Sequence, residues 1–180
     1  GGDRATKEER VQLALYMLEK QILNKGPDLI ASIMMESIVG AGGCLVFPEG
    51  YMQGVRAICD KYGILLHLDQ LMVGFGLTGK LFVFQHYEGV QPGIVSCAKG
   101  ISGAAIPISM TTCLEEIMNF FDNIPLGWGS TYQAHPVAIA CAYESVKFLL
   151  QNNLIGQVQQ ITPLFEECMQ RLANDHPSIK

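Results

Sequence analysis

Short apolar runs of strand length alternate along this chain with segments that have the apolar spacing of amphipathic helices. This alternation constrains the fold more than any other feature, because strands joined by helices pack as a mostly parallel sheet under right-handed crossover connections. We therefore predict an α/β fold, a mostly parallel sheet with flanking helices. The predicted strands cover residues 29–36, 64–69, 94–98 and 106–111, and the predicted helices cover residues 6–24, 49–61, 115–122, 135–153 and 154–174.

The composition fits one compact globular unit and argues against several classes of partner. The chain has 180 residues, of which 49% are hydrophobic and 16% are charged, so it can bury a sizeable core. A net charge of -5 without any cluster of lysine and arginine gives no basic surface for nucleic acid or for a membrane. No apolar run reaches the roughly 20 residues of a membrane span. We expect a cytoplasmic protein, with an organellar matrix also open, whose partner is a small molecule or another protein chain.

The cysteines and histidines show no spacing that predicts a metal site. The six cysteines include no C-x-x-C pair and several lie in apolar segments, which indicates reduced, buried thiols. The four histidines form neither an H-x-x-x-H nor an H-x-H pair. His67 falls in the middle of a predicted strand, where we interpret it as a core residue with a hydrogen-bond partner rather than a ligand.

Polar residues stand at or near the ends of the predicted strands. In open α/β sheets ligands bind beyond the carboxyl ends of the strands, so such residues are candidates for a functional site. Asp69 and Lys99 follow two consecutive strands, which places them at neighbouring strand ends. The full set is Glu36, Asp69, Lys99 and, less clearly, Thr111.

Lys99 has two interpretations at this level. A lysine between a buried strand and a turn of small residues loses contact with water, which favours the neutral, nucleophilic amine and suits imine chemistry. Alternatively, Lys99 extends to solvent or forms a structural ion pair with Asp69, which is the commoner use of a lysine near an aspartate. Residue spacing alone does not decide between them.

Three stretches of the chain are characteristic of a known family. The stretch "GAGGCLVFPEGYMQGVRAICDKYGILLHLDQLMVGFGLTGKLFVFQHY", then "QPGIVSCAKG" and "GWGSTYQAHPVAIACAY", resembles the class III pyridoxal-phosphate-dependent aminotransferases. The similarity runs from about residue 30 to residue 180. The resemblance implies the large-domain portion of the fold type I transferases, with pyridoxal 5'-phosphate as cofactor and transamination as the activity.

The same resemblance implies roles for individual residues. Asp69 matches the aspartate that keeps the pyridine nitrogen of the cofactor protonated, and Lys99 matches the lysine that forms the Schiff base and shuttles a proton. Thr131, beside Ser130, matches the threonine that binds the cofactor phosphate from the partner subunit of a homodimer. Met72 aligns near the 3′ oxygen of the cofactor. Glu36 matches a glutamate on the substrate side.

Several positions depart from the pattern of the family near the expected site. Gln70 stands in place of a glutamate, Leu77 in place of an arginine, Gly93 in place of an aspartate and Ser37 in place of a proline. His67 replaces a small or aliphatic residue. These departures fit a divergent active enzyme, which the retained lysine and aspartate favour. They also fit a catalytically degenerate homologue that acts as a dimer-forming scaffold or regulatory subunit.

The resemblance also implies an organisation for the chain and a class of substrate. Residues 1–133 correspond to part of the large cofactor-binding domain, and residues 134–180 to helices that link it to a C-terminal small domain. We expect a partial chain that lacks segments at both ends. The donor is expected to be an amine or ω-amino acid, taurine or β-alanine by a weak likeness, and the acceptor a keto acid such as pyruvate or 2-oxoglutarate.

Overall fold

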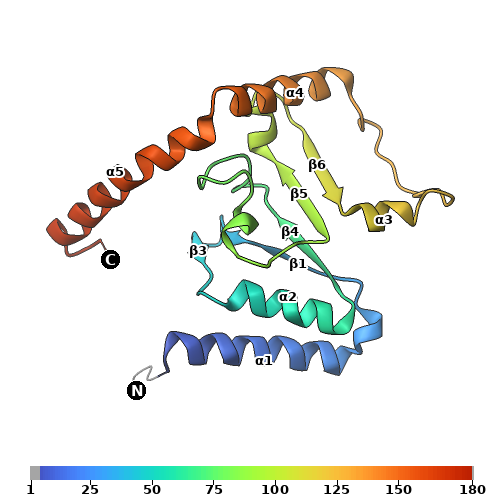
Figure 1. Cartoon of the computed structure of the whole chain (residues 1–180), viewed down its shortest axis with the longest axis horizontal. Coiled ribbons are helices and arrows are strands. Elements are labelled where there is room, and N and C mark those ends of the chain that lie inside the picture. The colour runs from blue at the N-terminus through green and yellow to red at the C-terminus, as the bar shows by residue number, and fades with distance from the viewer. Residues whose placement is uncertain (1–4, 180) are drawn as a thin grey trace.

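The sheet at the centre of the molecule follows the predicted α/β plan. The computed structural model describes residues 5–179 and contains a four-stranded sheet in the order β1-β4-β5-β6. The three strands β1 (Ser32–Glu36), β4 (Leu65–Asp69) and β5 (Ile94–Ala98) are parallel, and β6 (Ser109–Cys113) is antiparallel to β5. Figure 1 shows the strands side by side. The prediction of a mostly parallel sheet is confirmed.

Two helices form layers beneath one face of the sheet. Helix α1 (Lys7–Lys25) begins at a capping box in which Thr6 and Glu9 bond each other's backbone, and it ends at Gly26. Helix α2 (Tyr51–Tyr62) ends at Gly63 in the left-handed conformation. Figure 1 shows α2 between α1 and the sheet. The buried core between these layers contains Ile22, Met52, Val55, Cys59, Ile64, Leu66, Leu68 and Val90.

Three further helices follow the sheet along the chain. The short α3 (Glu115–Asn119) leads into an exposed loop, after which α4 (Pro136–Gln151) returns to the end of β5. There Ala142 packs with Cys97 and Ile101 in a second, smaller core. Helix α5 (Leu154–Asp175) then extends away from the sheet, as Figure 1 shows. The division of the chain at residue 133 stays a prediction.

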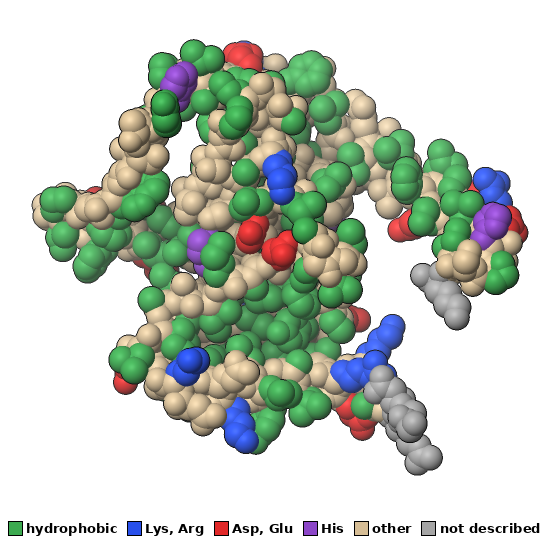
Figure 2. All heavy atoms as spheres, turned by 180° about the vertical axis from the view of Figure 1, so that it is seen from behind, with side chains coloured by type: hydrophobic (Ala, Val, Ile, Leu, Met, Phe, Trp, Pro, Cys, Tyr) green, Lys and Arg blue, Asp and Glu red, His purple; other side chains and the backbone are tan. Residues whose placement is uncertain are grey.

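The opposite face of the sheet is more open to solvent, and we call it the open face. Residues paired across the strands share a face, so the registers Glu36 to Asp69, Asp69 to Ser96 and Ser96 to Thr111 place one row of side chains on this side. Figure 2 views the molecule from behind, and on the face it shows, charged side chains of both signs and a histidine lie above an apolar layer. The open face carries Met34, Glu36, His67, Asp69, Ser96 and Thr111.

The structure differs from the prediction at the fourth strand. That strand was predicted over residues 106–111, but β6 covers Ser109–Cys113, so Thr111 lies in the middle of an antiparallel strand rather than at a carboxyl end. The connection from β5 consists of the short 3-10 helix η3 (Lys99–Ser102) and a turn. A link this short cannot make the crossover that a parallel strand needs, so the chain reverses.

Small elements complete the fold. The segments β2 (Ile38–Val39) and β3 (Leu45–Val46) form an antiparallel hairpin around a glycine-rich turn at residues 40–43, and the 3-10 helices η1 (Pro27–Leu29) and η2 (Val83–His86) lie in loops. Within residues 5–179 no helix is both long enough and apolar enough to cross a membrane.

Candidate active site

Asp69 ends β4 on the open face and has one carboxylate oxygen committed to the protein. Its Oδ1 accepts a hydrogen bond of 2.8 Å from the backbone N–H of Leu71, two residues further along. On either side, the strand register places Glu36 of β1 and Ser96 of β5. Its side chain is half-buried, and Oδ2 has no bonding partner among the described residues. A fixed carboxylate with one free oxygen suits a cationic or N–H-bearing ligand.

Lys99 follows β5 directly and has an unusual backbone. Its φ of 49° lies in the left-handed region, which is uncommon for residues other than glycine and concentrates at functional sites. Lys99 comes three residues after Ser96, the strand partner of Asp69, which corresponds to about 10 Å along the strand. The two candidate residues therefore lie at neighbouring strand ends, as predicted.

The surroundings of Lys99 do not match the interpretation of a desolvated, neutral amine. Its side chain is exposed, so residues 5–179 do not supply the desolvation that the sequence led us to expect. The open face has no covering layer above the strand end in this part of the chain. The exposed side chain fits the alternative in which Lys99 extends to solvent, while no ion pair joins Lys99 to Asp69 among the described residues.

Close packing of glycines holds the two strand ends against each other. A Cβ on Gly100 would lie 3.0 Å from Cβ of Phe75 and 3.3 Å from the carbonyl oxygen of Gly74. A Cβ on Gly74 would lie 2.8 Å from the carbonyl oxygen of Gln70. The turn after Lys99 therefore touches the turn after Asp69 at Gly100, and an added Cβ there, or at Gly74 within the first turn, would crowd neighbouring backbone.

Glu36 is tied to the turn that follows β1. Its Oε2 accepts a 2.8 Å hydrogen bond from the N–H of Gly40. Met72 lies against the same turn, because a Cβ on Gly40 would come within 2.5 Å of the Met72 sulfur and 3.4 Å of the Glu36 carboxylate. The structure thus brings Glu36 and Met72 together on either side of Gly40, beside the strand end that carries Asp69.

Two of the departures from the family pattern are partners in the structure. The side-chain amide of Gln70 donates to the hydroxyl of Ser37, and its Oε1 accepts a 2.8 Å bond from the N–H of Val83. The Tyr87 hydroxyl donates to the carbonyl of Ser37 at 3.0 Å. Gln70 and Ser37 are both completely buried. Sequence reasoning named both residues but gave no sign of their bond, because they are far apart in the chain.

A row of hydrogen-bonded side chains crosses the open face beside Asp69. The His67 Nε2 lies 2.8 Å from the Ser96 hydroxyl, which lies 3.1 Å from the hydroxyl of Thr111. Burial lowers the pKa of His67 from its ordinary value, while the charge of Asp69 raises it in part. His67 is half-buried with a hydrogen-bond partner, in agreement with its interpretation as a satisfied histidine.

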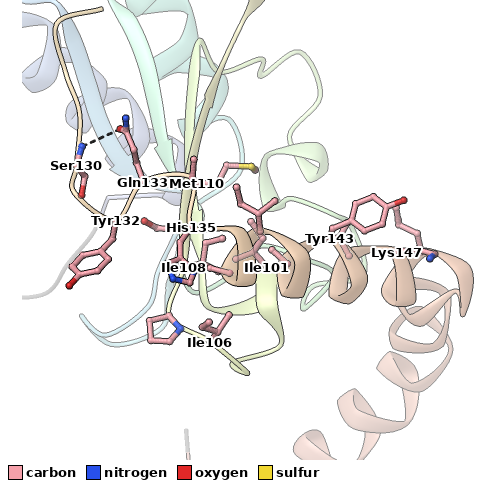
Figure 3. A pocket seen from close by; sticks show the side chains of 18 of the residues that line it. Ile101, Ile106, Ile108, Met110, Ser130, Tyr132, Gln133, His135, Tyr143 and Lys147 are labelled. Carbon is pink, nitrogen blue, oxygen red and sulfur yellow. Dashed lines mark hydrogen bonds between the residues drawn. The ribbon is translucent and has the colours of Figure 1, made fainter.

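Ser130 and Thr131 lie apart from the other candidate residues. They belong to the exposed loop before α4, where the backbone N–H of Ser130 donates to the Gln133 side chain at 3.1 Å. Figure 3 shows this loop at the edge of a cleft of about 1310 Å³ between β6 and α4. Neither Asp69 nor Lys99 lines that cleft. Most of its lining is apolar, including Ile101, Ile108, Met110, Trp128, Ile139 and Tyr143.

The comparisons with known proteins assign the chain to a family. The family model described as aminotransferase class-III matches residues 3–180, and the chain belongs to this family. Among solved structures, a taurine:2-oxoglutarate aminotransferase from Bifidobacterium kashiwanohense, in complex with PLP and glutamate, is 35% identical with a TM-score of 0.91. That match covers 97% of this chain and 39% of the other.

Two further structures give the same result. A thermostable (S)-enantioselective omega-transaminase from Thermomicrobium roseum is 37% identical with a TM-score of 0.88, covering 96% of this chain and 39% of the other. An S-selective transaminase from Bacillus megaterium is 31% identical with a TM-score of 0.87, covering 91% of this chain and 35% of the other. The present chain therefore spans about two fifths of the length of these structures.

The donor set of the site fits the cofactor of this family. Pyridoxal 5'-phosphate carries a basic ring nitrogen and an aldehyde on opposite sides of one ring, and the strand ends present a carboxylate and a primary amine. The free oxygen of Asp69 can accept from a protonated ring nitrogen, and Lys99 is unpaired among the described residues. Glycine at position 100 lets the backbone after Lys99 lie close to Phe75 and to the carbonyl of Gly74, in the turn that follows Asp69.

Proposed function

We propose that this chain is part of a transaminase that moves an amino group from an amine or ω-amino acid to a keto acid with pyridoxal 5'-phosphate. The observation that carries the proposal is the pairing of two strand ends, one with a half-free carboxylate at Asp69 and the next with a strained, unpaired lysine at Lys99. Both features are costly to stability without a ligand, because backbone strain and a half-buried charge need compensation.

When bound, the cofactor supplies an electron sink for the carbon that loses its proton. The chain supplies the groups around it. Asp69 holds a proton on the ring nitrogen, because its fixed carboxylate favours the cationic ring. Lys99 would hold the cofactor through its amine, and its Nζ would be the base that accepts the proton from the substrate carbon bearing the amino group.

Glu36 and Met72 form the substrate-side edge of the proposed site. Because Glu36 Oε2 is held by the Gly40 N–H, the carboxylate has a fixed position and its second oxygen remains for a polar group of the ligand. Met72 is 44% exposed and gives the edge an apolar surface next to that charge. A polar anchor beside an apolar wall suits an ω-amino compound with a short carbon chain. The likeness to a taurine aminotransferase supports this class of donor, with pyruvate or 2-oxoglutarate as acceptor.

We further propose that the active unit is a homodimer in which each site takes its phosphate-binding group from the partner. The support is the position of Ser130 and Thr131 on an exposed loop, where Ser130 bonds Gln133 and neither residue bonds Asp69 or Lys99 of the same chain among the described residues. The apolar cleft beside this loop gives the second copy a surface to bury. A cytoplasmic location also stays a prediction, supported by six free cysteines, which suit a reducing compartment.

Trapping of the cofactor tests the proposed activity directly. The protein is mixed with a small excess of pyridoxal 5'-phosphate, reduced with borohydride and digested, and the modified lysine is located by mass spectrometry. We expect selective modification of Lys99. Lys99→Arg should abolish the selective label, and Asp69→Asn should reduce it. The matched control Lys80→Ala, which removes an exposed lysine of the glycine-rich loop, should leave the label unchanged.

Unselective labelling would contradict the proposed site. Modification spread evenly over the exposed lysines, with no effect of Asp69→Asn, would overturn the proposed site. The degenerate scaffold would then be the better description, and it predicts association with a catalytically complete relative without transamination. For the homodimer, sedimentation of the wild-type chain and of a Tyr143→Asp variant in the cleft gives the test. Equal monomeric behaviour of both contradicts the proposed interface.

A further inference from the structure

The row formed by His67, Ser96 and Thr111 crosses three adjacent strands on the open face. Each residue bonds its neighbour through the side chain, at 2.8 Å between His67 Nε2 and the Ser96 hydroxyl and at 3.1 Å between the two hydroxyls. All three strands therefore contribute to fixing the imidazole. A histidine on this face needs such a partner, since an unpaired half-buried ring nitrogen loses hydrogen bonds to water.

The imidazole of His67 and the carboxylate of Asp69 are neighbours on the open face of β4. The two residues are separated by one position on β4, so their side chains leave the same face of the strand at a spacing of about 6.6 Å. The half-buried setting weakens screening, and the negative charge of Asp69 favours the charged form of the ring while burial favours the neutral form. His67 is thus within electrostatic reach of the carboxylate that the proposed function assigns to the cofactor.

Uncharged residues and one fixed carboxylate, Glu36, face this pair from the neighbouring strands. On β1, Met34 lies opposite His67 and is apolar, while Glu36 lies opposite Asp69 and is held by Gly40. On β5 and β6 the facing residues Ser96 and Thr111 carry no charge. Within residues 5–179, Asp69 is the charged group that acts on the pKa of His67.

Hydroxyl partners allow the ring to change its protonation state without moving. A serine or threonine hydroxyl is both donor and acceptor, and its hydrogen rotates to suit its neighbour. When His67 is neutral, Ser96 can donate to Nε2 and accept from Thr111. When His67 is charged, Nε2 donates to Ser96, and the hydroxyls turn the other way. The row therefore holds the imidazole in one place across its titration.

We propose that His67 is a positioning residue for Asp69 whose protonation competes with the cofactor for the charge of that carboxylate. This inference rests on the proposed function and adds a pH dependence to the same site. A protonated imidazole and a protonated pyridine ring both draw on one negative charge. A positive charge on either ring disfavours a positive charge on the other, and by linkage the effect is reciprocal.

The coupling has a direct consequence for binding. Below the pKa of His67, the charged imidazole already offsets part of the charge of Asp69, so a protonated cofactor ring gains less from that carboxylate. At higher pH the ring is neutral and serves only to support the strand end. The affinity for pyridoxal 5'-phosphate should therefore weaken on acidification by more than the titration of the cofactor itself explains.

The first test needs no cofactor. The pKa of each histidine is measured by NMR in the 180-residue chain and in Asp69→Asn. Removing the carboxylate charge should lower the pKa of His67 further, because only burial then acts on it. The ring of His86, which bonds Thr78 instead, serves as the internal reference and should not shift. An unchanged His67 pKa in Asp69→Asn overturns the proposal even if cofactor binding is normal.

The second test measures the dissociation constant of pyridoxal 5'-phosphate by fluorescence in wild type and in His67→Gln, which keeps a hydrogen-bonding side chain but cannot charge. On acidification from about pH 8 to about pH 5, a range that extends well below the ordinary histidine pKa because burial lowers the pKa of His67, the wild-type constant should rise by at least about fivefold relative to the variant. His86→Gln is the matched control and should follow wild type. A parallel rise in wild type and His67→Gln overturns the proposal. Absence of binding in both proteins with a positive first test would instead contradict the proposed function.

Discussion

The side-chain amide of Gln70 and the hydroxyl of Ser37 form a buried hydrogen bond that ties the end of β4 to the residue after β1. Considered separately, each residue lacks a feature of the family pattern. Gln70 lacks the charge of a glutamate, and Ser37 lacks the rigid backbone of a proline. Together they replace those features with a neutral pair. Because Gln70 also accepts from Val83, one uncharged side chain joins three segments directly beneath Glu36 and Asp69.

Replacing Gln70 should therefore destabilise the fold strongly. Gln70→Leu leaves the N–H of Val83 and the hydroxyl of Ser37 buried without partners, at about 1–3 kcal/mol for each group. We expect a loss of about 2–4 kcal/mol in the free energy of unfolding, measured by urea denaturation. In the double variant with Ser37→Ala the loss should be smaller than the sum of the single losses. Strict additivity would show that the two side chains do not act as a pair.

The lowered pKa of His67 should make the stability of the fold depend on pH. Its pKa is lowered from the ordinary value of 6.5 in the folded protein, so the unfolded chain binds the proton more readily. This contribution to stability is present above pH 6.5 and is lost as the pH falls through the lower, folded-state pKa. His67→Gln should flatten the decline of the melting temperature on acidification. The control His86→Gln should keep the wild-type slope, and identical slopes in all three proteins would contradict the assignment.

The elements of the central sheet were predictable because their patterns are local. The runs that became β1, β4 and β5 are short and apolar, and the residues at their ends were placed correctly as neighbours before any register was known. The same reasoning located Asp69 and Lys99. A buried strand that ends in a charged residue is a strong signal, since the charge needs a reason to be there.

The features that the sequence did not predict depend on contacts between distant residues. The direction of β6 follows from the short turn around Gly103, which a pattern of apolar residues does not encode. The Ser37 and Gln70 bond requires that two strand ends already be adjacent. The choice between the two interpretations of Lys99, desolvated or extended to solvent, depends on what covers the open face, and no local propensity contains that information.

The turn that follows Asp69 should be intolerant of a single added methyl group at Gly74. In Gly74→Ala the new Cβ meets the carbonyl oxygen of Gln70 at 2.8 Å, and backbone cannot move aside as a flexible side chain can. We expect a loss of about 1–3 kcal/mol in the free energy of unfolding, in line with other cases of overpacking. The matched control is Gly129→Ala, where the contacts are of ordinary length at 3.6 Å or more. Equal stability of the two variants would show that the turn relaxes freely.

Thiol labelling should separate the cysteines by their place in the fold. Burial raises the pKa of the thiols of Cys59 and Cys97, which lowers the share of reactive thiolate, and both side chains are fully buried. Cys44 is exposed on the turn before β3. With iodoacetamide, followed by mass spectrometry of the peptides, Cys44 should react first. The two core thiols should react on the order of a hundredfold more slowly, because they need an opening that costs about 3 kcal/mol.

Two controls separate protection by the fold from differences in the intrinsic reactivity of the thiols. In concentrated urea all six cysteines should react at similar rates, which shows that the difference belongs to the fold and not to neighbouring residues. A Cys44→Ser variant removes the fast label and allows the slow sites to be followed alone. Cys97 lies in β5 two residues before Lys99, so its protection reports directly on the strand that presents the lysine. Rapid labelling of Cys97 with slow labelling of Cys59 would show that β5 opens while the core around α2 stays closed.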